Sequence, residues 1–315
     1  MSMIMNGEFV RSDLTKNAMG GTESQAEALV KYVDKKLLSN FQIHVSRVKE
    51  NVVDPKKTQI IWAHDLPGDP EVAHLKNGGW DAYDKLVFVS NWQLQMYNAY
   101  LGVPYSKSVV LQNAIEPIPT HLKSSTNDGI NLIYHTTPHR GLELLYPAFN
   151  QLSKDFDNVH LDVYSSFEMY GWGVRDEEYK KLFDLLKAHP NVTYHGFQPN
   201  EVVREALTKA HIFAYPSIWQ ETSCIALMEA LSAECLVVHP NLAALPETAA
   251  NWTNMYQWHE NPREHINVFY KTLYELVDKI VNENCLPVLS QSSYANKVYG
   301  WDNRISQWEN FLESF

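Results

Sequence analysis

The sequence predicts an α/β protein made of two doubly wound domains, each with a parallel sheet. Short runs of β-branched and apolar residues alternate with amphipathic stretches along the chain, and this alternation is typical of parallel strands joined by right-handed helical crossovers. The length of 315 residues suits two domains of about 150 residues each. Residues 116–129 form a polar segment with two prolines, which is the best candidate for a linker.

The expected elements follow in order along the chain. Apolar and β-branched runs predict strands at residues 42–48, 59–64, 86–90, 108–112, 131–135, 160–164, 193–195, 212–215, 236–239 and 255–257. Helical periodicity predicts helices at residues 23–38, 92–101, 141–155, 176–188, 201–210, 225–233, 263–284 and 294–315. Ligands of such sheets bind at the carboxyl ends of the strands, so we expect functional residues in the loops that lead from strand to helix.

The composition narrows the class of protein. A net charge of −11 argues against general nucleic-acid binding, which usually needs a basic surface. The three cysteines, Cys224, Cys235 and Cys285, are odd in number and widely spaced, which favours a reducing compartment over a disulfide framework. No run approaches the ~18 apolar residues of a membrane span, and the start of the chain lacks the pattern of a signal peptide. We therefore expect a cytoplasmic protein, with peripheral membrane contact left open.

The most informative stretch is PSIWQETSCIALMEA, residues 216–230. A strand ends at Pro216, and Thr222 and Ser223 are good N-cap residues for an apolar helix whose free N–H groups suit a phosphate or a sugar hydroxyl. Glu229 falls inside that helix, where an unpaired carboxylate would cost about 3 kcal/mol or more. The residues alone favour equally a polar ligand, such as a ribose diol, and a structural arginine or lysine as its partner.

The same stretch resembles the E-x7-E signature of retaining glycosyltransferases of family 4, with Glu221 and Glu229 as the two glutamates. The resemblance implies the GT-B fold, in which two Rossmann-like doubly wound domains face each other across a cleft, here with a reduced N-terminal domain. It also implies that Glu229 holds the ribose hydroxyls of a nucleotide. Glu221 would face the donor sugar and diphosphate together with the backbone amides of Thr222, Ser223, Cys224 and Ile225.

Two N-terminal features are similar to the same family. Gly20 and Gly21 directly precede a predicted helix, so the backbone there can approach a ligand closely, although a bare Gly-Gly is more often only a turn. The resemblance implies that this loop lies over the donor phosphates. His64 ends a predicted strand, where a lone histidine is more often structural. It matches a family histidine near the donor's sugar and phosphate.

Arg140, in the stretch HTTPHRGLELL, matches half of the family's diphosphate clamp, with arginine in place of lysine. The upstream family arginine is absent, and residues 135–137 occupy that region. Either Arg140 acts alone or a histidine helps it. The resemblance also implies that the loop at Gly196 and Phe197 borders the base. Glu234 stands where a glycine normally ends the helix, and a left-handed glutamate costs roughly 1 kcal/mol.

The sequence is therefore interpreted as a metal-independent, retaining glycosyltransferase that moves a sugar from a nucleotide-diphosphate sugar, UDP- or GDP-linked, to an acceptor hydroxyl. We expect an acceptor-side domain over residues 1–118, with a helix over 294–315 crossing back onto it, and a nucleotide-sugar domain over 128–293. The acceptor would be a sugar, a glycan or a lipid-linked acceptor. The alternatives are a nucleotide-sugar epimerase, a phosphorylase and a non-catalytic nucleotide-sugar-binding protein.

No cofactor and no metal site are expected, because no metal-ligand spacing is present and the Asp-x-Asp at residues 155–157 lies at a helix end. The sequence does not name the donor sugar, the base, the acceptor, the linkage or the oligomeric state.

Overall fold

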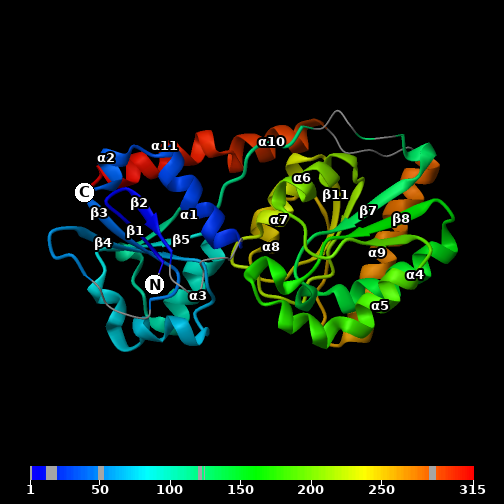
Figure 1. The fold of residues 1–315 in the computed structure, drawn as a ribbon, viewed down its shortest axis with the longest axis horizontal. Helices are drawn as coiled ribbons and strands as arrows, with labels where there is room; N and C mark the ends of the chain where they lie inside the picture. Colours follow the sequence, from blue (N-terminus) through cyan, green and yellow to red (C-terminus); the bar gives the residue numbers. More distant parts are fainter. Residues whose placement is uncertain (1, 12–19, 49–52, 120–122, 124, 284–288) are drawn as a thin grey trace. The chain divides into compact units, whose positions relative to one another are not determined.

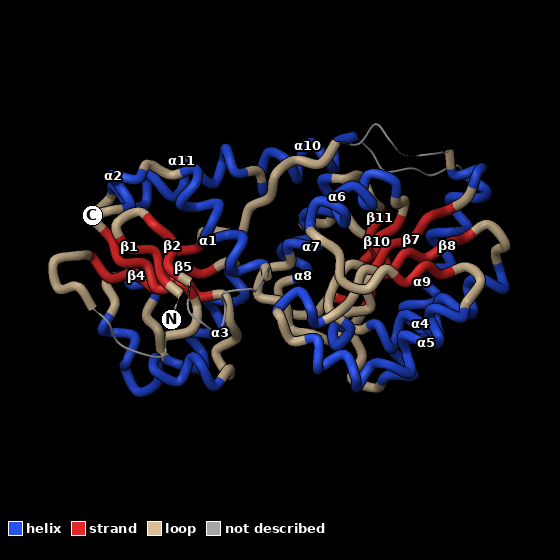
Figure 2. The backbone as a smooth tube through the Cα atoms, in the orientation of Figure 1, coloured by secondary structure: helices blue, strands red, loops and turns tan. Residues whose placement is uncertain are grey.

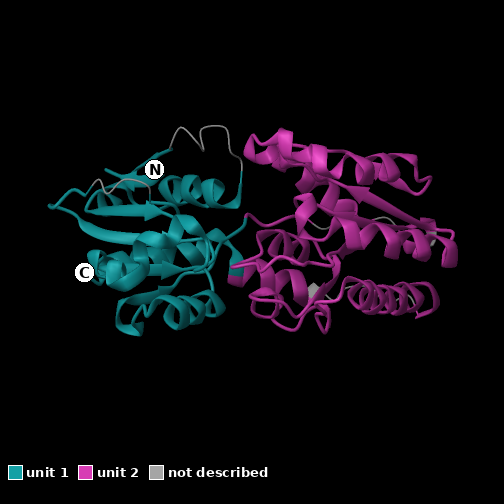
Figure 3. Ribbon diagram, turned by 90° about the horizontal axis from the view of Figure 1, so that it is seen from below, with its two compact units in different colours: residues 1–115, 299–315 teal, residues 116–298 magenta. Residues whose placement is uncertain are grey.

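The computed structural model describes residues 2–11, 20–48, 53–119, 123, 125–283 and 289–315. The chain divides into two compact units, shown in Figure 3. Unit 1 comprises Met1–Ile115 and Tyr299–Phe315, and unit 2 comprises Glu116–Val298. Each unit contains one six-stranded sheet with helices packed against it (Figures 1 and 2).

The sheet of unit 1 has the strand order β2-β1-β3-β4-β5-β6. Its strands are β1 (Met3–Met5), β2 (Glu8–Val10), β3 (Phe41–Val45), β4 (Thr58–Ala63), β5 (Lys85–Phe88) and β6 (Ser108–Val110). Its helices are α1 (Gly21–Tyr32), α2 (Lys35–Leu38), α3 (Asn91–Leu101) and α11 (Trp301–Glu313), with 3-10 turns η2 (Pro70–Ala82) and η3 (Tyr105–Lys107).

The first two strands depart from the parallel sheet that the sequence predicts. β1 pairs antiparallel with both β2 and β3, and the β1–β2 turn consists of Asn6 and Gly7, with φ of 55° and 69°. An Asn-Gly pair with two positive φ angles is the preferred turn of a two-residue hairpin. β2 therefore runs in the same direction as β3. Since β2 is the strand that precedes Gly20 in sequence, it ends at the edge of the sheet where the parallel strands β3 to β6 have their carboxyl ends.

The C-terminal segment is also different from the single helix expected over 294–315. It forms α10 (Leu289–Tyr299), most of which belongs to unit 2, and α11, which belongs to unit 1. Gly300 separates them because its backbone is extended and pairs with Ile115 as a β-bridge. In unit 1, the Trp308 ring of α11 packs edge-on against Trp62 of β4, at 4.9 Å between ring centroids.

The sheet of unit 2 is parallel throughout and has the order β12-β11-β10-β7-β8-β9. Its strands are β7 (Ile130–Tyr134), β8 (Val159–Val163), β9 (Val192–Tyr194), β10 (Ile212–Ala214), β11 (Leu236–Pro240) and β12 (Asn254–Tyr256). Its other helices are α4 (Leu142–Asp155), α5 (Lys180–Ala188), α6 (Asn200–Lys209), α7 (Ile225–Ser232), α8 (Leu245–Ala249) and α9 (Pro262–Glu283). Short 3-10 turns are η4 (Thr126–Asp128), η5 (Pro138–Arg140), η6 (Phe167–Tyr170) and η7 (Gly173–Tyr179).

The connections of this sheet determine where a ligand is expected. From β7 the chain builds outward through β8 to β9, then returns to place β10 on the other side of β7. The strand order therefore reverses between β7 and β10, and the loops that follow these two strands flank the usual ligand position of a doubly wound sheet.

The end of α7 confirms the strained helix end predicted at Glu234. This residue has φ of 57°, and its carboxylate accepts a hydrogen bond from the Ser292 hydroxyl at 2.8 Å. Ala243, in the loop that follows β11, has φ of 54°. Both residues have left-handed backbone conformations, which favour glycine.

Two further observations concern the chain as a whole. Cys224 and Cys235 are buried free thiols, whereas Cys285 lies outside the described residues. Among the helices that the structure describes, none has the length and apolar content to cross a membrane.

Candidate active site

The loops after β7 and β10 meet in direct backbone contact in unit 2. Gly141 follows Arg140 with φ of 126°, and a Cβ atom at this position would lie 2.2 Å from the carbonyl oxygen of Pro216. Only glycine satisfies both the backbone angle and this contact. The Ile218 N–H also donates to the Arg140 carbonyl at 3.3 Å. The glycine of the Arg-Gly-Leu motif thus brings the two loops together.

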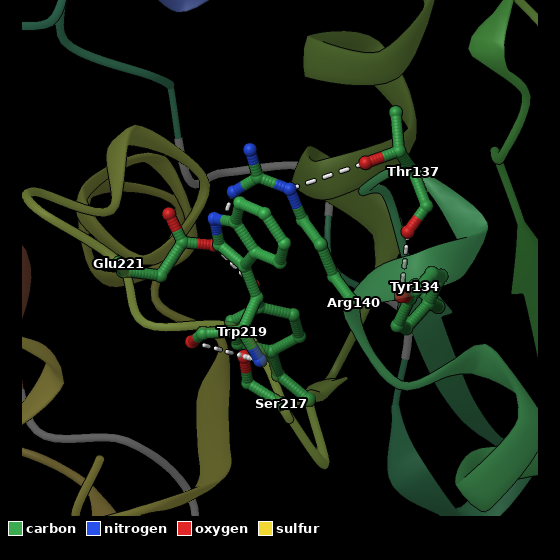
Figure 4. Close-up of polar contacts among 7 residues, drawn as sticks. Tyr134, Thr137, Arg140, Ser217, Trp219 and Glu221 are labelled. Atoms are coloured by element: carbon green, nitrogen blue, oxygen red, sulfur yellow. Dashed lines mark hydrogen bonds and ion pairs between the residues drawn. The ribbon is translucent and has the colours of Figure 1, made fainter. Parts of the chain in front are cut away.

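This contact pairs Arg140 with Glu221, which are separated by 81 residues in sequence (Figure 4). The Arg140 Nη1 donates to the Glu221 carboxylate, and its Nε donates to the Thr137 hydroxyl at 3.1 Å. Burial lowers the pKa of Arg140, but the Glu221 carboxylate raises it, so that it lies well above its ordinary value. The guanidinium is therefore a permanent cation at the strand switch.

Tyr215 completes the surroundings of Glu221. Its hydroxyl, at the end of β10, donates to the same carboxylate oxygen at 2.5 Å. Glu221 is only 5% exposed, and two donors compensate the loss of its hydration. The sequence predicted Glu221 and Arg140 as site residues, but it did not predict that they pair or that Tyr215 joins them.

Aromatic side chains border the ion pair on one side. Trp219 is 41% exposed, and the Arg140 Cζ lies 6.0 Å from its ring centroid. Figure 4 shows the indole next to the guanidinium. His139 meets Trp219 edge-on at 4.8 Å and stacks on Phe167 at 5.1 Å. Burial, with smaller contributions from Arg140 and Arg175, lowers the pKa of His139 to about 4, so the ring is neutral near pH 7.

The N-terminus of α7 directly follows Glu221. Cys224 is its N-cap residue and makes no capping bond with its side chain. The Ser223 hydroxyl oxygen is buried without a hydrogen-bond partner among the described residues. Burial, and then the Glu221 charge, raises the pKa of the Cys224 thiol above its ordinary value. Cys224 is thus a neutral thiol rather than a nucleophile, and the helix end offers polar groups suited to an anion.

Glu229 lies one turn further into α7 and has a cationic partner. The Arg204 Nη1, on α6, donates to its Oε1 at 2.7 Å, while the Arg204 Nη2 donates to the carbonyls of Glu116 and Pro117 at 2.9 and 3.2 Å. Burial raises the pKa of Glu229, and Arg204 opposes this shift. The structural arginine that the sequence left open is therefore present. The only available signal in the sequence was an arginine on the helix that precedes the Glu229 helix.

The predicted base-side loop follows β9, which β7 and β8 separate from β10 in the sheet. Gly196 has φ of 65°, and Phe197 is half-buried. The preceding His195 stacks on Tyr164 at 4.2 Å between centroids, and its Nε2 lies 2.7 Å from the Asp162 Oδ1. The structure leaves the role of this loop as a prediction.

The remaining predicted residues belong to unit 1. Gly20 caps α1 and Gly21 is its first residue, at the carboxyl edge of that sheet. His64 follows β4, with its ring 4.7 Å from Trp62, and burial lowers its pKa to about 3. His64 is therefore neutral at physiological pH. The part of the chain that the structure describes holds no group of three His, Cys, Asp or Glu side chains arranged for a metal ion.

Comparison with known proteins adds a family and a fold. Residues 121–268 match the family described as Glycosyl transferases group 1. No curated protein matches the sequence.

Several solved structures are similar at low identity. Anabaena HepE in complex with UDP and glucose is 14% identical with a TM-score of 0.61, and the match covers 82% of this chain and 72% of HepE. A glycosyltransferase from Rickettsia africae ESF-5 is 14% identical with a TM-score of 0.66, over 97% of this chain and 83% of that one. The pneumococcal O-GlcNAc transferase GtfA, with UDP and GlcNAc, is 11% identical with a TM-score of 0.58, over 82% and 53%. These likenesses confirm the predicted GT-B class with two Rossmann-like domains.

Proposed function

We propose that this protein, whose residues 121–268 match the family described as Glycosyl transferases group 1, transfers a sugar from a nucleoside-diphosphate sugar to an acceptor hydroxyl. The observation that carries the proposal is the Arg140–Glu221 pair at the start of α7, where the strand order of unit 2 reverses. A cation, a carboxylate and a helix N-terminus are there combined at the usual ligand position of a doubly wound sheet.

The diphosphate binds at the cation and the helix end. Arg140 is permanently charged and able to make bidentate phosphate contacts. The amides from Thr222 to Ile225 and the Ser223 hydroxyl supply neutral donors. The structures of HepE with UDP and with UDP-glucose, which share this fold, support a uridine nucleotide, and GDP-linked donors are the second choice.

The two glutamates bind two other parts of the donor, the sugar and the ribose. Glu221, beside the diphosphate, accepts hydrogen bonds from the donor sugar. Glu229, neutralised in part by Arg204, accepts from the ribose hydroxyls. Gly196 and Phe197 border the base. In unit 1, the Gly20-Gly21 loop would lie over the donor phosphates, and His64 would orient the donor.

The chemistry proposed for this donor is transfer with retention of anomeric configuration and without a metal ion. The bond between the anomeric carbon and the diphosphate oxygen breaks, and a bond to the acceptor oxygen forms on the same face. The leaving phosphate takes the acceptor proton, so no side-chain base is required. Arg140 and the α7 amides stabilise the negative charge that develops on the diphosphate.

The acceptor is a sugar, a glycan or a lipid-linked sugar, and the reaction takes place in the cytoplasm. The buried free thiols Cys224 and Cys235 support a reducing compartment.

A ligand screen followed by product analysis tests the proposal. Thermal unfolding is measured with UDP-, GDP-, ADP- and TDP-sugars, because a bound donor stabilises the folded state by mass action. The donor that raises Tm is then assayed with and without EDTA, and NMR identifies the anomer of the product. A new donor epimer formed without acceptor, an inverted product, or activity abolished by EDTA would each contradict one part of the proposal.

A further inference from the structure

A hydrogen-bonded loop places a second arginine beside the loop that carries Arg140. The loop after β8 spans residues 164–179 and is closed by Asp176. The Asp176 carboxylate accepts from the Ser166 hydroxyl at 2.5 Å and from the Phe167 N–H at 2.8 Å. Arg175, next to Asp176, is thereby held near the carboxyl end of β8. Because β8 is the neighbour of β7, this loop lies on the side of Arg140 opposite to β10 and Glu221.

Aromatic rings connect the two arginines. Phe167, His139 and Trp219 form a continuous series of ring contacts at 5.1 and 4.8 Å between centroids. The Arg175 Cζ lies 5.9 Å from the Phe167 centroid at one end, and the Arg140 Cζ lies 6.0 Å from the Trp219 centroid at the other. The charges of both arginines act on His139 in the middle and help to lower its pKa. Both guanidinium groups therefore lie near the His139 ring.

The contacts of Arg175 leave its hydrogen-bond donors available. Its guanidinium lies over the Trp172 ring, with the Cζ 4.5 Å from the centroid, and it forms no ion pair among the described residues. A cation held on ring faces is oriented without using its five N–H groups. The side chain is exposed, so its N–H groups are accessible to an anion from solvent. By contrast, Glu221 already compensates the charge of Arg140.

We propose that Arg175 is the second cation that binds the diphosphate of the donor, on the side of Arg140 away from Glu221. This inference rests on the proposed function and fills the position for which the sequence offers no upstream arginine. A diphosphate carries more negative charge than one partly neutralised arginine can compensate. A guanidinium from the adjacent loop supplies the remaining charge without adding a residue to the β7 loop itself.

Calorimetric titration with nucleotides and nucleosides tests this role. UDP, GDP, uridine and guanosine are titrated into the wild type and into Arg175→Ala, Arg175→Lys and Arg263→Ala. Arg263 is the matched control because it is an exposed arginine of unit 2, at the start of α9, after the far edge strand β12. We expect Arg175→Ala to weaken the diphosphate about tenfold, with a lower salt dependence and unchanged nucleoside binding. Arg175→Lys restores part of the affinity, and Arg263→Ala matches the wild type.

Each result decides the question. Equal diphosphate affinity in Arg175→Ala and Arg263→Ala, in proteins that melt at the wild-type temperature without ligand, overturns the role of Arg175 and leaves the proposed function intact. A loss that is equal for diphosphate and nucleoside also overturns it, because it indicates a distorted site. If the wild type binds neither UDP nor GDP, the proposed uridine or guanosine donor fails together with the role of Arg175 in binding its diphosphate.

Discussion

The two glutamates of the E-x7-E stretch each pair with an arginine, yet the two pairs differ in what holds the arginine. The side chains are equally buried, with both arginines 21% exposed and Glu221 and Glu229 at 7% and 8%. Arg204 also donates to two backbone carbonyls at residues 116 and 117. Arg140 has instead a threonine hydroxyl and the half-exposed Trp219 ring beside it.

This difference concerns the two arginines: Arg204 is fixed by backbone contacts as well as by Glu229, whereas Arg140 is the arginine that we propose to bind the diphosphate. Arg204 fastens α6, α7 and the segment at 116–117 of unit 2, and moving it would leave three acceptors unsatisfied. Arg140 sits at the strand switch, where a phosphate can replace or share its partner. Burial and pairing are therefore the same for the two pairs, and the second contacts of each arginine are what distinguish the pair that we propose to bind the diphosphate.

The largest effect is expected for Arg140→Ala. It removes one cation of the proposed diphosphate site and leaves Glu221 buried without its cationic partner, with the Tyr215 hydroxyl still donating to it. We expect kcat/KM to fall about 10²–10³-fold and the free energy of unfolding to fall by about 3 kcal/mol. Steady-state kinetics and urea unfolding measure both. Arg140→Lys keeps the charge, and equal activity of Arg140→Ala and wild type would remove Arg140 from the mechanism.

Arg204→Ala sharpens the comparison because it breaks the other pair. Glu229 then stays buried without its cation, so we expect a similar stability loss of about 3 kcal/mol, but a smaller loss of kcat. Unfolding curves and kinetics at saturating donor separate the two effects. Glu229→Ala is expected to weaken nucleotide binding in addition, and unchanged donor affinity in that variant would show that Glu229 does not hold the ribose.

Trp219→Ala is expected to have an intermediate effect, about tenfold or less in kcat/KM. The indole contributes about 0.5–1 kcal/mol of cation–π interaction with Arg140, and its truncation loosens the guanidinium without leaving a buried charge. Stability should change little because the ring is 41% exposed. Trp219→Phe keeps a ring face and should retain most of the activity. A loss in Trp219→Phe as large as in Trp219→Ala would indicate that the indole acts other than by its ring face.

Glu229→Gln should change how stability depends on pH. The pKa of Glu229 is raised in the folded state, first by burial, so above its ordinary value of 4.5 the unfolded chain releases a proton that the folded chain retains. Stability from this group is then lost as pH rises through that window, by at most about 1.4 kcal/mol per pH unit. Thermal melts from pH 4.5 to 7 should show the wild type losing stability relative to Glu229→Gln. A constant difference across that range would contradict the raised pKa.

The smallest effect is expected for Glu234→Gly, at the end of the helix that carries Glu229. Glycine removes a left-handed cost of about 1 kcal/mol, but the bond from Ser292 to the carboxylate is lost. We expect a net gain in stability below about 1 kcal/mol, with kinetics unchanged. A drop in activity would mean that this helix end positions the glutamates.

The ten strands predicted from apolar and β-branched runs are all present within a few residues, because burial in a parallel sheet imposes that composition locally. The left-handed backbone of Glu234 was likewise predictable, because the end of a helix requires a particular conformation of the residues next to it. The β1–β2 hairpin was missed although Asn6 and Gly7 signalled it, because its strands are only three residues each. The helix over 294–315 was broken by a pairing with Ile115, which no local pattern records.

At the site, the sequence by itself determined the residue types: two glutamates around a helix N-terminus and an arginine before a glycine. Tertiary structure decided which charges meet. Arg140 reaches Glu221 only because Gly141 lets two loops touch, and Arg204 reaches Glu229 only because α6 packs beside α7. Arg175 lies near the Arg140 loop because β8, which precedes the Arg175 loop, is the neighbour of β7 in the sheet. Helical periodicity and capping depend on a few neighbouring residues and can therefore be predicted from the sequence. Ion-pair partners that are 25 or 81 residues apart are instead brought together by the packing of the whole sheet.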